Sequence, residues 1–271
     1  MRIGVYQFSS TNRMDHNLKI IHKAIRLAAE NKVKLLAFHE CALCGYPPIE
    51  SKIEEIRKED IENALAQISV WTRQYHMYVA VGSVRFDNGQ RFNSMIMFGN
   101  RGEIIGYYDK KALWGWDADH FTMGTREGIF EIDDVKVGFR ICFDIRFPEL
   151  FRELYRQNVD ICVVSFSDTK ETPQPERYHI IKAHLITRAM ENVMPIVSVN
   201  SITNFQTAPT AVFDWNGCCV KEAEKEIETL LLYDYEKPEM SFGIKGRVAN
   251  NNLFLKMDSG YKLRAEESEN T

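Results

Sequence analysis

Three segments of the chain place reactive side chains directly after apolar, strand-like runs. These segments are His39-Glu40-Cys41, Asp109-Lys110-Lys111 and Cys142-Phe143-Asp144. In mixed α/β sheets, ligands gather beyond the carboxyl ends of strands, where the chain turns and exposes side chains together with backbone N–H groups. Thiols, carboxylates and ammonium groups gathered there can supply a nucleophile, a base and an electrophile.

Cys142 has the position of a nucleophile at the end of a strand. Residues 135–141 alternate as a half-buried strand does, and Pro148 favours the start of a helix soon after. Such a turn lies beside N–H groups and a positive helix dipole end, which favour a thiolate and an oxyanion. The alternative is a thiol that only fills the strand end. The other cysteines are expected to be free thiols: Cys41, Cys44, Cys162, Cys218 and Cys219.

The base that would activate this thiol is more readily a carboxylate than a histidine. His39 is adjacent to Glu40, so its side chain is expected on the other face of the strand. His179 and His184 share a predicted helix at a spacing that suits no zinc motif. Glu40, at a strand end, is therefore the best-placed base.

Strand-like and helix-like segments alternate from residue 1 to about residue 235. Strands are expected near 3–8, 32–38, 77–86, 92–98, 103–108, 135–141, 160–166, 196–200, 210–213 and 228–233, and helices near 15–28, 60–75, from 148 onward and at 177–192. This mixture predicts an α/β fold. No linker or internal repeat divides the chain, so one domain is expected.

The composition excludes several function classes. With 34 Lys+Arg against 38 Asp+Glu the net charge is −4, and no basic cluster is present, which argues against binding to nucleic acid or to a membrane surface. No apolar run approaches the roughly 20 residues that span a bilayer. The first eight residues alternate like a strand and lack the apolar block of a signal peptide. A cytoplasmic location is therefore expected.

Three blocks, in the right order, resemble the nitrilase, or carbon–nitrogen hydrolase, superfamily. Residues 38–48 resemble its strand-end glutamate followed by Gly-Tyr-Pro, residues 106–110 its Tyr-x-Lys segment, and residues 138–149 its cysteine block. Residues 188–192 are similar to its Arg-Ala-x-Glu-Asn helix end. The resemblance covers roughly residues 1–235.

The resemblance implies a fold and an assembly. The fold is an α-β-β-α sandwich of one domain over residues 1–235. Residues 236–271 would be a C-terminal extension involved in oligomer contacts, with a loose acidic end at 266–271. Superfamily members generally self-associate through the helix after the cysteine and a helix near residue 180, which implies at least a homodimer.

The resemblance also implies a mechanism that needs no metal and no organic cofactor. Glu40 would take the proton of Cys142, whose thiolate attacks an amide carbonyl to form a thioester. Lys110, rather than Lys111, has the family's lysine position. Lys110 and the backbone N–H of Phe143 would stabilise the oxyanion.

One departure from the family pattern concerns a second carboxylate. Family members usually carry a glutamate after the lysine and shortly before an aromatic-x-x-Gly turn. Counting back from the turn at 121–124 places Asp117 there, with Asp119 as a second possibility. An aspartate keeps the charge but is one methylene shorter. The alternative is that both are ordinary loop carboxylates.

The residues after Cys142 point to the ω-amidase-like branch of the superfamily. That branch implies a small linear carboxamide, including monoamides of dicarboxylic acids, whose free carboxylate needs a cation such as Arg146 or Lys170. Trp114 and Trp116 are candidates to line the pocket. Two other functions stay open: an N-carbamoyl amide hydrolase, and a catalytically silent binding or scaffold member of the fold.

Overall fold

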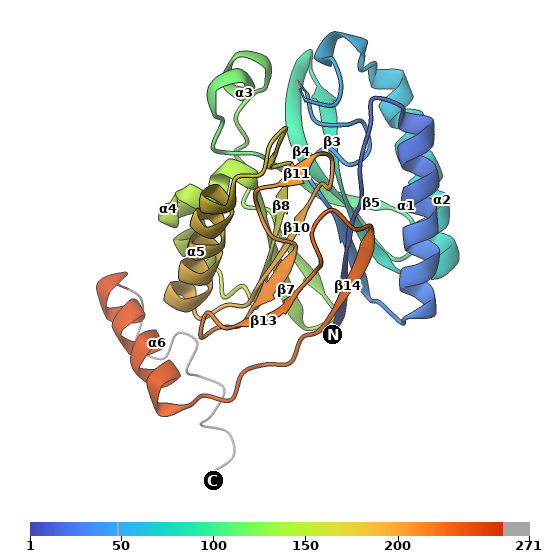
Figure 1. The fold of residues 1–271 in the computed structure, drawn as a ribbon. Coiled ribbons are helices and arrows are strands. Elements are labelled where there is room, and N and C mark those ends of the chain that lie inside the picture. The colour runs from blue at the N-terminus through green and yellow to red at the C-terminus, as the bar shows by residue number, and fades with distance from the viewer. Residues whose placement is uncertain (48, 257–271) are drawn as a thin grey trace.

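The strands form two six-stranded sheets that pack face to face (Figure 1). A computed structural model describes residues 1–47 and 49–256. The first sheet has the order β14-β1-β2-β3-β4-β5, and its strands are β1 (Arg2–Gln7), β2 (Leu35–Phe38), β3 (Tyr78–Asp87), β4 (Gln90–Phe98), β5 (Ile104–Asp109) and β14 (Thr229–Asp234). The second has the order β13-β12-β10-β8-β7-β6, and its strands are β6 (Ile129–Ile132), β7 (Val135–Ile141), β8 (Ile161–Phe166), β10 (Ile196–Asn200), β12 (Ala211–Phe213) and β13 (Cys219–Glu222).

Helices cover both outer faces of this sheet pair. The helices are α1 (Met14–Glu30), α2 (Lys58–Tyr75), α3 (Gly115–His120), α4 (Pro148–Arg156), α5 (Pro175–Asn192) and α6 (Phe242–Phe254), with 3-10 turns η1 (Ile53–Glu55) and η2 (Cys142–Arg146). In Figure 1, α1 and α2 lie outside the first sheet, and α4 and α5 lie outside the second. The predicted α-β-β-α sandwich is confirmed.

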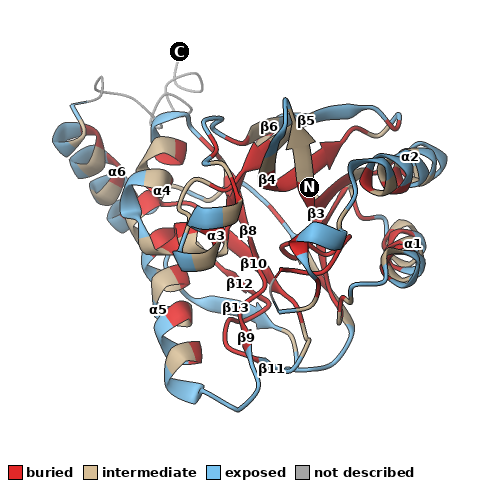
Figure 2. Cartoon of the chain, turned by 90° about the horizontal axis from the view of Figure 1, so that it is seen from above, coloured by how far each residue is buried: buried red, intermediate tan, exposed pale blue. Residues whose placement is uncertain are grey.

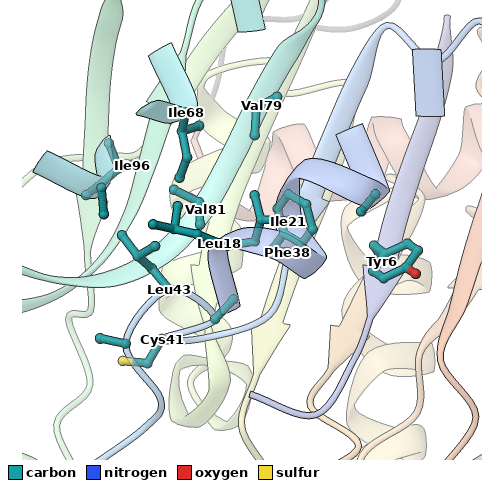
Figure 3. Close-up of a cluster of buried hydrophobic side chains, with 14 of the residues drawn as sticks. Tyr6, Leu18, Ile21, Phe38, Cys41, Leu43, Ile68, Val79, Val81 and Ile96 are labelled. Atoms are coloured by element: carbon teal, nitrogen blue, oxygen red, sulfur yellow. The ribbon is translucent and has the colours of Figure 1, made fainter. Parts of the chain in front are cut away.

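Three apolar layers hold the sandwich together. Leu18, Ile21 and Ile25 recur at helical spacing on α1 and face the first sheet, where Figure 3 shows Ile21 close to Phe38 of β2. A second layer lies between the sheets, and a third lies under α4 and α5. Each fully buried large side chain contributes about 1.5–3 kcal/mol. The helices are therefore held in place chiefly by packing against the sheets.

Most of the helices and strands agree with the sequence prediction to within a few residues, but several elements were not predicted. The elements missed are α3, β6, β13, η1, η2, α6 and the two-stranded pair β9 (Thr169–Lys170) and β11 (Phe205–Gln206). Most of these segments are short and carry little periodic pattern. The helix α6 is longer, with 13 residues, but Ile244 and Val248 are its only buried apolar residues. Figure 2 shows how burial concentrates in the sheets, while the outer sides of the helices are exposed.

The C-terminal part leaves the sandwich after β14. Ile244 and Val248 of α6 pack in a small cluster with Val193, at the end of α5. The acidic end predicted at 266–271 lies outside the described residues. Within residues 1–47 and 49–256, no helix is both long and apolar enough to span a membrane.

Candidate active site

The carboxyl ends of strands from both sheets meet at one end of the sandwich. β2 is parallel to β3, and two successive antiparallel pairings give β5 the same direction; in the second sheet β7 and β8 are parallel. The Glu40 N–H donates to the Phe166 carbonyl at 3.3 Å, and the Ser165 hydroxyl donates to the Phe38 carbonyl at 2.9 Å. These bonds hold the ends of β2 and β8 together.

Glu40 is fully buried, and both of its carboxylate oxygens are engaged. Oε1 accepts hydrogen bonds from Lys110 Nζ at 2.8 Å and from Asn93 Nδ2 at 2.7 Å. Oε2 accepts from the backbone N–H of Ser167 at 2.8 Å. These donors fix the orientation of the carboxylate.

Lys110 bridges two carboxylates, and the second of them is Asp117. Its Nζ lies 2.6 Å from Asp117 Oδ2, and the Tyr46 hydroxyl donates to Asp117 Oδ1 at 2.7 Å. Asp117 is fully buried within α3, whereas Asp119 is exposed. The short turn of α3 thus brings the shorter aspartate side chain within reach of the lysine.

The buried charges shift one another's pKa. Burial raises the pKa of the Glu40 carboxyl; the Lys110 cation opposes this rise, and the Asp117 charge adds to it. Burial alone lowers the pKa of Lys110, but the negative charges around it, with Glu40 first, outweigh burial and leave that pKa well above its usual value. Lys110 therefore stays charged, and the raised pKa of Glu40 makes its carboxyl group better able to accept a proton than an exposed glutamate.

Cys142 begins η2, directly after β7, in a left-handed backbone conformation with φ of 45°. That conformation is strained for a residue other than glycine and is common at functional turns. Asp144 holds the turn, because its carboxylate accepts from the Tyr108 hydroxyl at 2.8 Å and from the N–H groups of Ile141 and Ala112 at 2.9 and 2.8 Å.

The thiol of Cys142 differs from the sequence expectation in its resting charge. The turn was expected to favour a thiolate, but burial raises the pKa of the Cys142 thiol well above its usual value, and the Glu40 charge raises it further. The following segment is a 3-10 turn, and α4 begins only at Pro148. The resting thiol is therefore protonated and needs a base.

Cys142 faces a cavity of about 400 Å³. The cavity is lined by Tyr46, Ile49, Trp114, Cys142, Phe143, Ile145, Arg146, Ser167, Asp168, Thr169, Lys170, Arg177 and Ile181. Three groups from the sequence prediction, Trp114, Arg146 and Lys170, are thus at the cavity. The prediction differs at Trp116, which is not among the lining residues. Its ring stacks on His120, with centroids 3.9 Å apart, and packs against the apolar layer of the first sheet.

Several residues of the site carry no sequence signal that the prediction used. Asn93 lies within β4 and not at the end of a strand in the sequence. Tyr46 was part of the quoted Gly-Tyr-Pro block but had no role assigned; its hydroxyl connects Asp117 to Trp114 Nε1, at 3.2 Å. In the described part of the chain, no cluster of three or more His, Cys, Asp or Glu side chains could hold a metal ion.

Comparison with known proteins gives a matching family model and several relatives named as amidases. The family model described as carbon-nitrogen hydrolase matches residues 2–240. A 2-oxoglutaramate amidase of Bacillus subtilis is 30% identical over 55% of this chain and 57% of its own length, so the chain spans little more than half of that relative. An omega-amidase of Xenopus tropicalis is 24% identical over 83% of this chain and 85% of its own length.

Solved structures share the fold. A crystal structure of an amidase from Nesterenkonia sp. superposes with a TM-score of 0.77, at 21% identity, over 87% of this chain and 90% of that one. The family match spans most of the sequence and includes all three predicted blocks. The superfamily predicted from those blocks is thereby confirmed, and the chain belongs to the carbon–nitrogen hydrolase family.

Proposed function

We propose that this chain hydrolyses the non-peptide C–N bond of a small linear carboxamide to an acid and ammonia. One observation carries the proposal: a buried Glu40–Lys110–Asp117 chain, with contacts of 2.8 and 2.6 Å, lies beside a cavity that Cys142 lines. Nucleophile, base and cation are then all supplied by the protein itself.

The first half of the reaction forms a thioester. Glu40 accepts the thiol proton, and the Cys142 sulfur attacks the amide carbon. Lys110 and the backbone N–H of Phe143 stabilise the resulting oxyanion, since preorganised donors act strongly in a water-poor site. Glu40 then protonates the leaving nitrogen, the C–N bond breaks, and ammonia departs.

The second half regenerates the enzyme. Glu40, ionised again, takes a proton from water, whose oxygen attacks the thioester carbon. The C–S bond breaks, the acid is released, and Cys142 recovers its proton from Glu40. A carboxylate that serves as base, acid and base needs a raised pKa, which burial and Asp117 both favour.

The proposed substrates are short monoamides, as in the ω-amidase-like branch. The names of the Bacillus and Xenopus relatives favour this class. Arg146 and Lys170 line the cavity and are candidates to attract a free carboxylate, and Trp114 supplies an apolar wall. We further propose a cytoplasmic homodimer or larger homo-oligomer, with the catalytic domain at 1–235 and oligomer contacts in the extension 236–271.

A substrate panel tests the activity. Ammonia release should be measured from dicarboxylic acid monoamides, neutral amides, N-carbamoyl amino acids and nitriles, with Cys142→Ala beside the wild type. We expect monoamides to be preferred and Cys142→Ala to lower turnover by about 10⁴-fold or more. Cys218→Ala, which removes an exposed thiol outside the cavity, is the matched control and should keep full activity.

Other results would change the assignment. Preference for N-carbamoyl amino acids would favour that alternative with the same residues. Ammonia release that survives Cys142→Ala would overturn the mechanism. A wild-type protein that releases ammonia from none of these compounds would favour a silent binding or scaffold role.

A further inference from the structure

We propose that Arg177 is the specificity-determining cation of the cavity and binds a carboxylate at the end of the substrate remote from the amide. This inference rests on the proposed function and assigns a residue outside the family motifs. Arg177 lies in the first turn of α5 and lines the cavity that also holds Cys142. The sequence alone points only to Arg146 and Lys170 for this role.

Asp168 positions the guanidinium of Arg177 with two bonds. Arg177 Nε donates to Oδ1 at 2.9 Å, and Nη2 donates to Oδ2 at 2.7 Å. The Asp168 side chain is only 6% exposed, and the Thr207 hydroxyl also donates to it, at 2.5 Å. Asn200 binds the Asp168 backbone on both sides, through Oδ1 at 2.9 Å and Nδ2 at 2.8 Å. The anchor is therefore rigid.

The third nitrogen of this guanidinium is left for a ligand. Within the described residues, Arg177 Nη1 donates no hydrogen bond, and the side chain keeps 35% of its surface exposed. A guanidinium that is already fixed loses little conformational entropy when it binds a carboxylate. The guanidinium of Arg177 is thus fixed in orientation by Asp168, and its Nη1 can donate hydrogen bonds to a substrate.

The other two cations are held less firmly. In the described part of the chain, neither Arg146 nor Lys170 forms an ion pair. Arg146 lies over the Phe143 ring, 5.8 Å from its centroid, and Lys170 is exposed. Both add positive charge, and the lining carboxylate, Asp168, is already paired with Arg177. The cavity therefore favours an anionic amide, oriented by Arg177.

The test compares an anionic amide with a neutral one of similar length. Succinamate and butyramide are the probes, and the readout is the ratio of their kcat/KM values. Arg177→Gln should lower the succinamate-to-butyramide ratio by about 10- to 100-fold, chiefly through a higher KM for succinamate. Arg57→Gln is the matched control, because it removes an equivalent two-bond pair with Asp60, at 2.7 and 2.8 Å, on the surface. That control should leave the ratio unchanged.

A second variant distinguishes the loss of substrate binding by Arg177 from repulsion of the substrate by Asp168. Arg177→Gln leaves the Asp168 carboxylate unpaired, and its charge would itself repel an anionic substrate. In the double variant Asp168→Asn with Arg177→Gln that charge is gone, so the ratio should stay low. Arg177→Lys, which keeps the charge without the planar fork, should give an intermediate ratio and covers the case that Arg177→Gln does not fold.

Four outcomes would overturn the inference. They are an unchanged ratio in Arg177→Gln, recovery of the ratio in the double variant, a ratio that falls only in Arg146→Gln or Lys170→Gln, and a wild type that hydrolyses butyramide but not succinamate. Failure of the proposed function looks different, because a wild type that releases ammonia from neither probe overturns both.

Discussion

At the scale of single residues, the proposed mechanism depends on how Asp117 sets the proton affinity of Glu40. The two carboxylates contact the same ammonium group, Lys110, so the charge of each acts on the other. Asp117→Asn removes one negative charge, which should lower the raised pKa of Glu40. In the proposed mechanism Glu40 must be ionised to accept the thiol proton, so the acid limb of the kcat/KM profile should move to lower pH. The profile of ammonia release against pH measures this shift.

Tyr46→Phe is the control for that shift. It removes the hydroxyl that donates to Asp117 but leaves the charges of Glu40, Lys110 and Asp117 in place. Its acid limb should stay close to that of the wild type. An acid limb that is unmoved in Asp117→Asn, or that moves to higher pH, would contradict the role given to Asp117.

The same scale shows which site residues a sequence can reveal. Glu40, Lys110 and Cys142 could be proposed from the sequence because each lies in a motif at the end of a predicted strand. Asn93 and Arg177 were not found, since their positions depend on the pairing of β4 and on the packing of α5 over the cavity. Such contacts between distant segments leave no local pattern in the sequence.

At the scale of elements, the strand β3 supports the turn that carries Glu40. A Cβ atom added to Gly82 would lie 2.2 Å from the His39 carbonyl oxygen and 2.5 Å from the Cys41 nitrogen. Both atoms belong to backbone, which cannot move aside without displacing Glu40. Gly82→Ala should therefore lower the free energy of unfolding by about 1–3 kcal/mol and reduce turnover. Thermal unfolding and ammonia release measure the two effects.

Gly243→Ala provides the comparison within the same chain. Gly243 lies in the first turn of α6, and an added Cβ would meet no atom within 4 Å. Alanine is favoured over glycine in a helix by roughly 0.5–1 kcal/mol, so this variant should be as stable as the wild type or slightly more stable. Gly82→Ala with an unfolding temperature equal to that of Gly243→Ala would show that β3 does not constrain the turn.

Elements were predictable where pattern and length agreed. Residues 135–141 alternate clearly, and the strand was predicted with the bounds of β7. In contrast, α3 has six residues around Asp117 and no repeating apolar face. The contact of Asp117 with Lys110 could therefore not be predicted from the periodicity of the sequence. The resemblance to the family, by its spacing from the turn at 121–124, did indicate Asp117.

At the scale of the whole molecule, the site exists because two sheets end together. Glu40 and Lys110 follow strands of the first sheet and Cys142 follows a strand of the second, and Figure 1 shows α3 at one end of the molecule, above α4 and α5. No single sheet carries the full set. The α-β-β-α class could be predicted from the motifs. The contacts between the two sheets, such as those that join the ends of β2 and β8, are seen only in the structure.

At the same scale, the protein is expected to self-associate. We expect a homodimer or larger at micromolar concentration by light scattering, with α4 and α5 at the contact. Ile180 lies on α5 with 52% of its surface exposed, and Ile180→Asp should shift the mass towards the monomer, because burying an unpaired carboxylate is costly. Val70→Asp is the matched control, since Val70 is 49% exposed on α2, in the opposite helical layer. A monomeric wild type would refute self-association, and equal masses for the two variants would place the contact elsewhere than on α5.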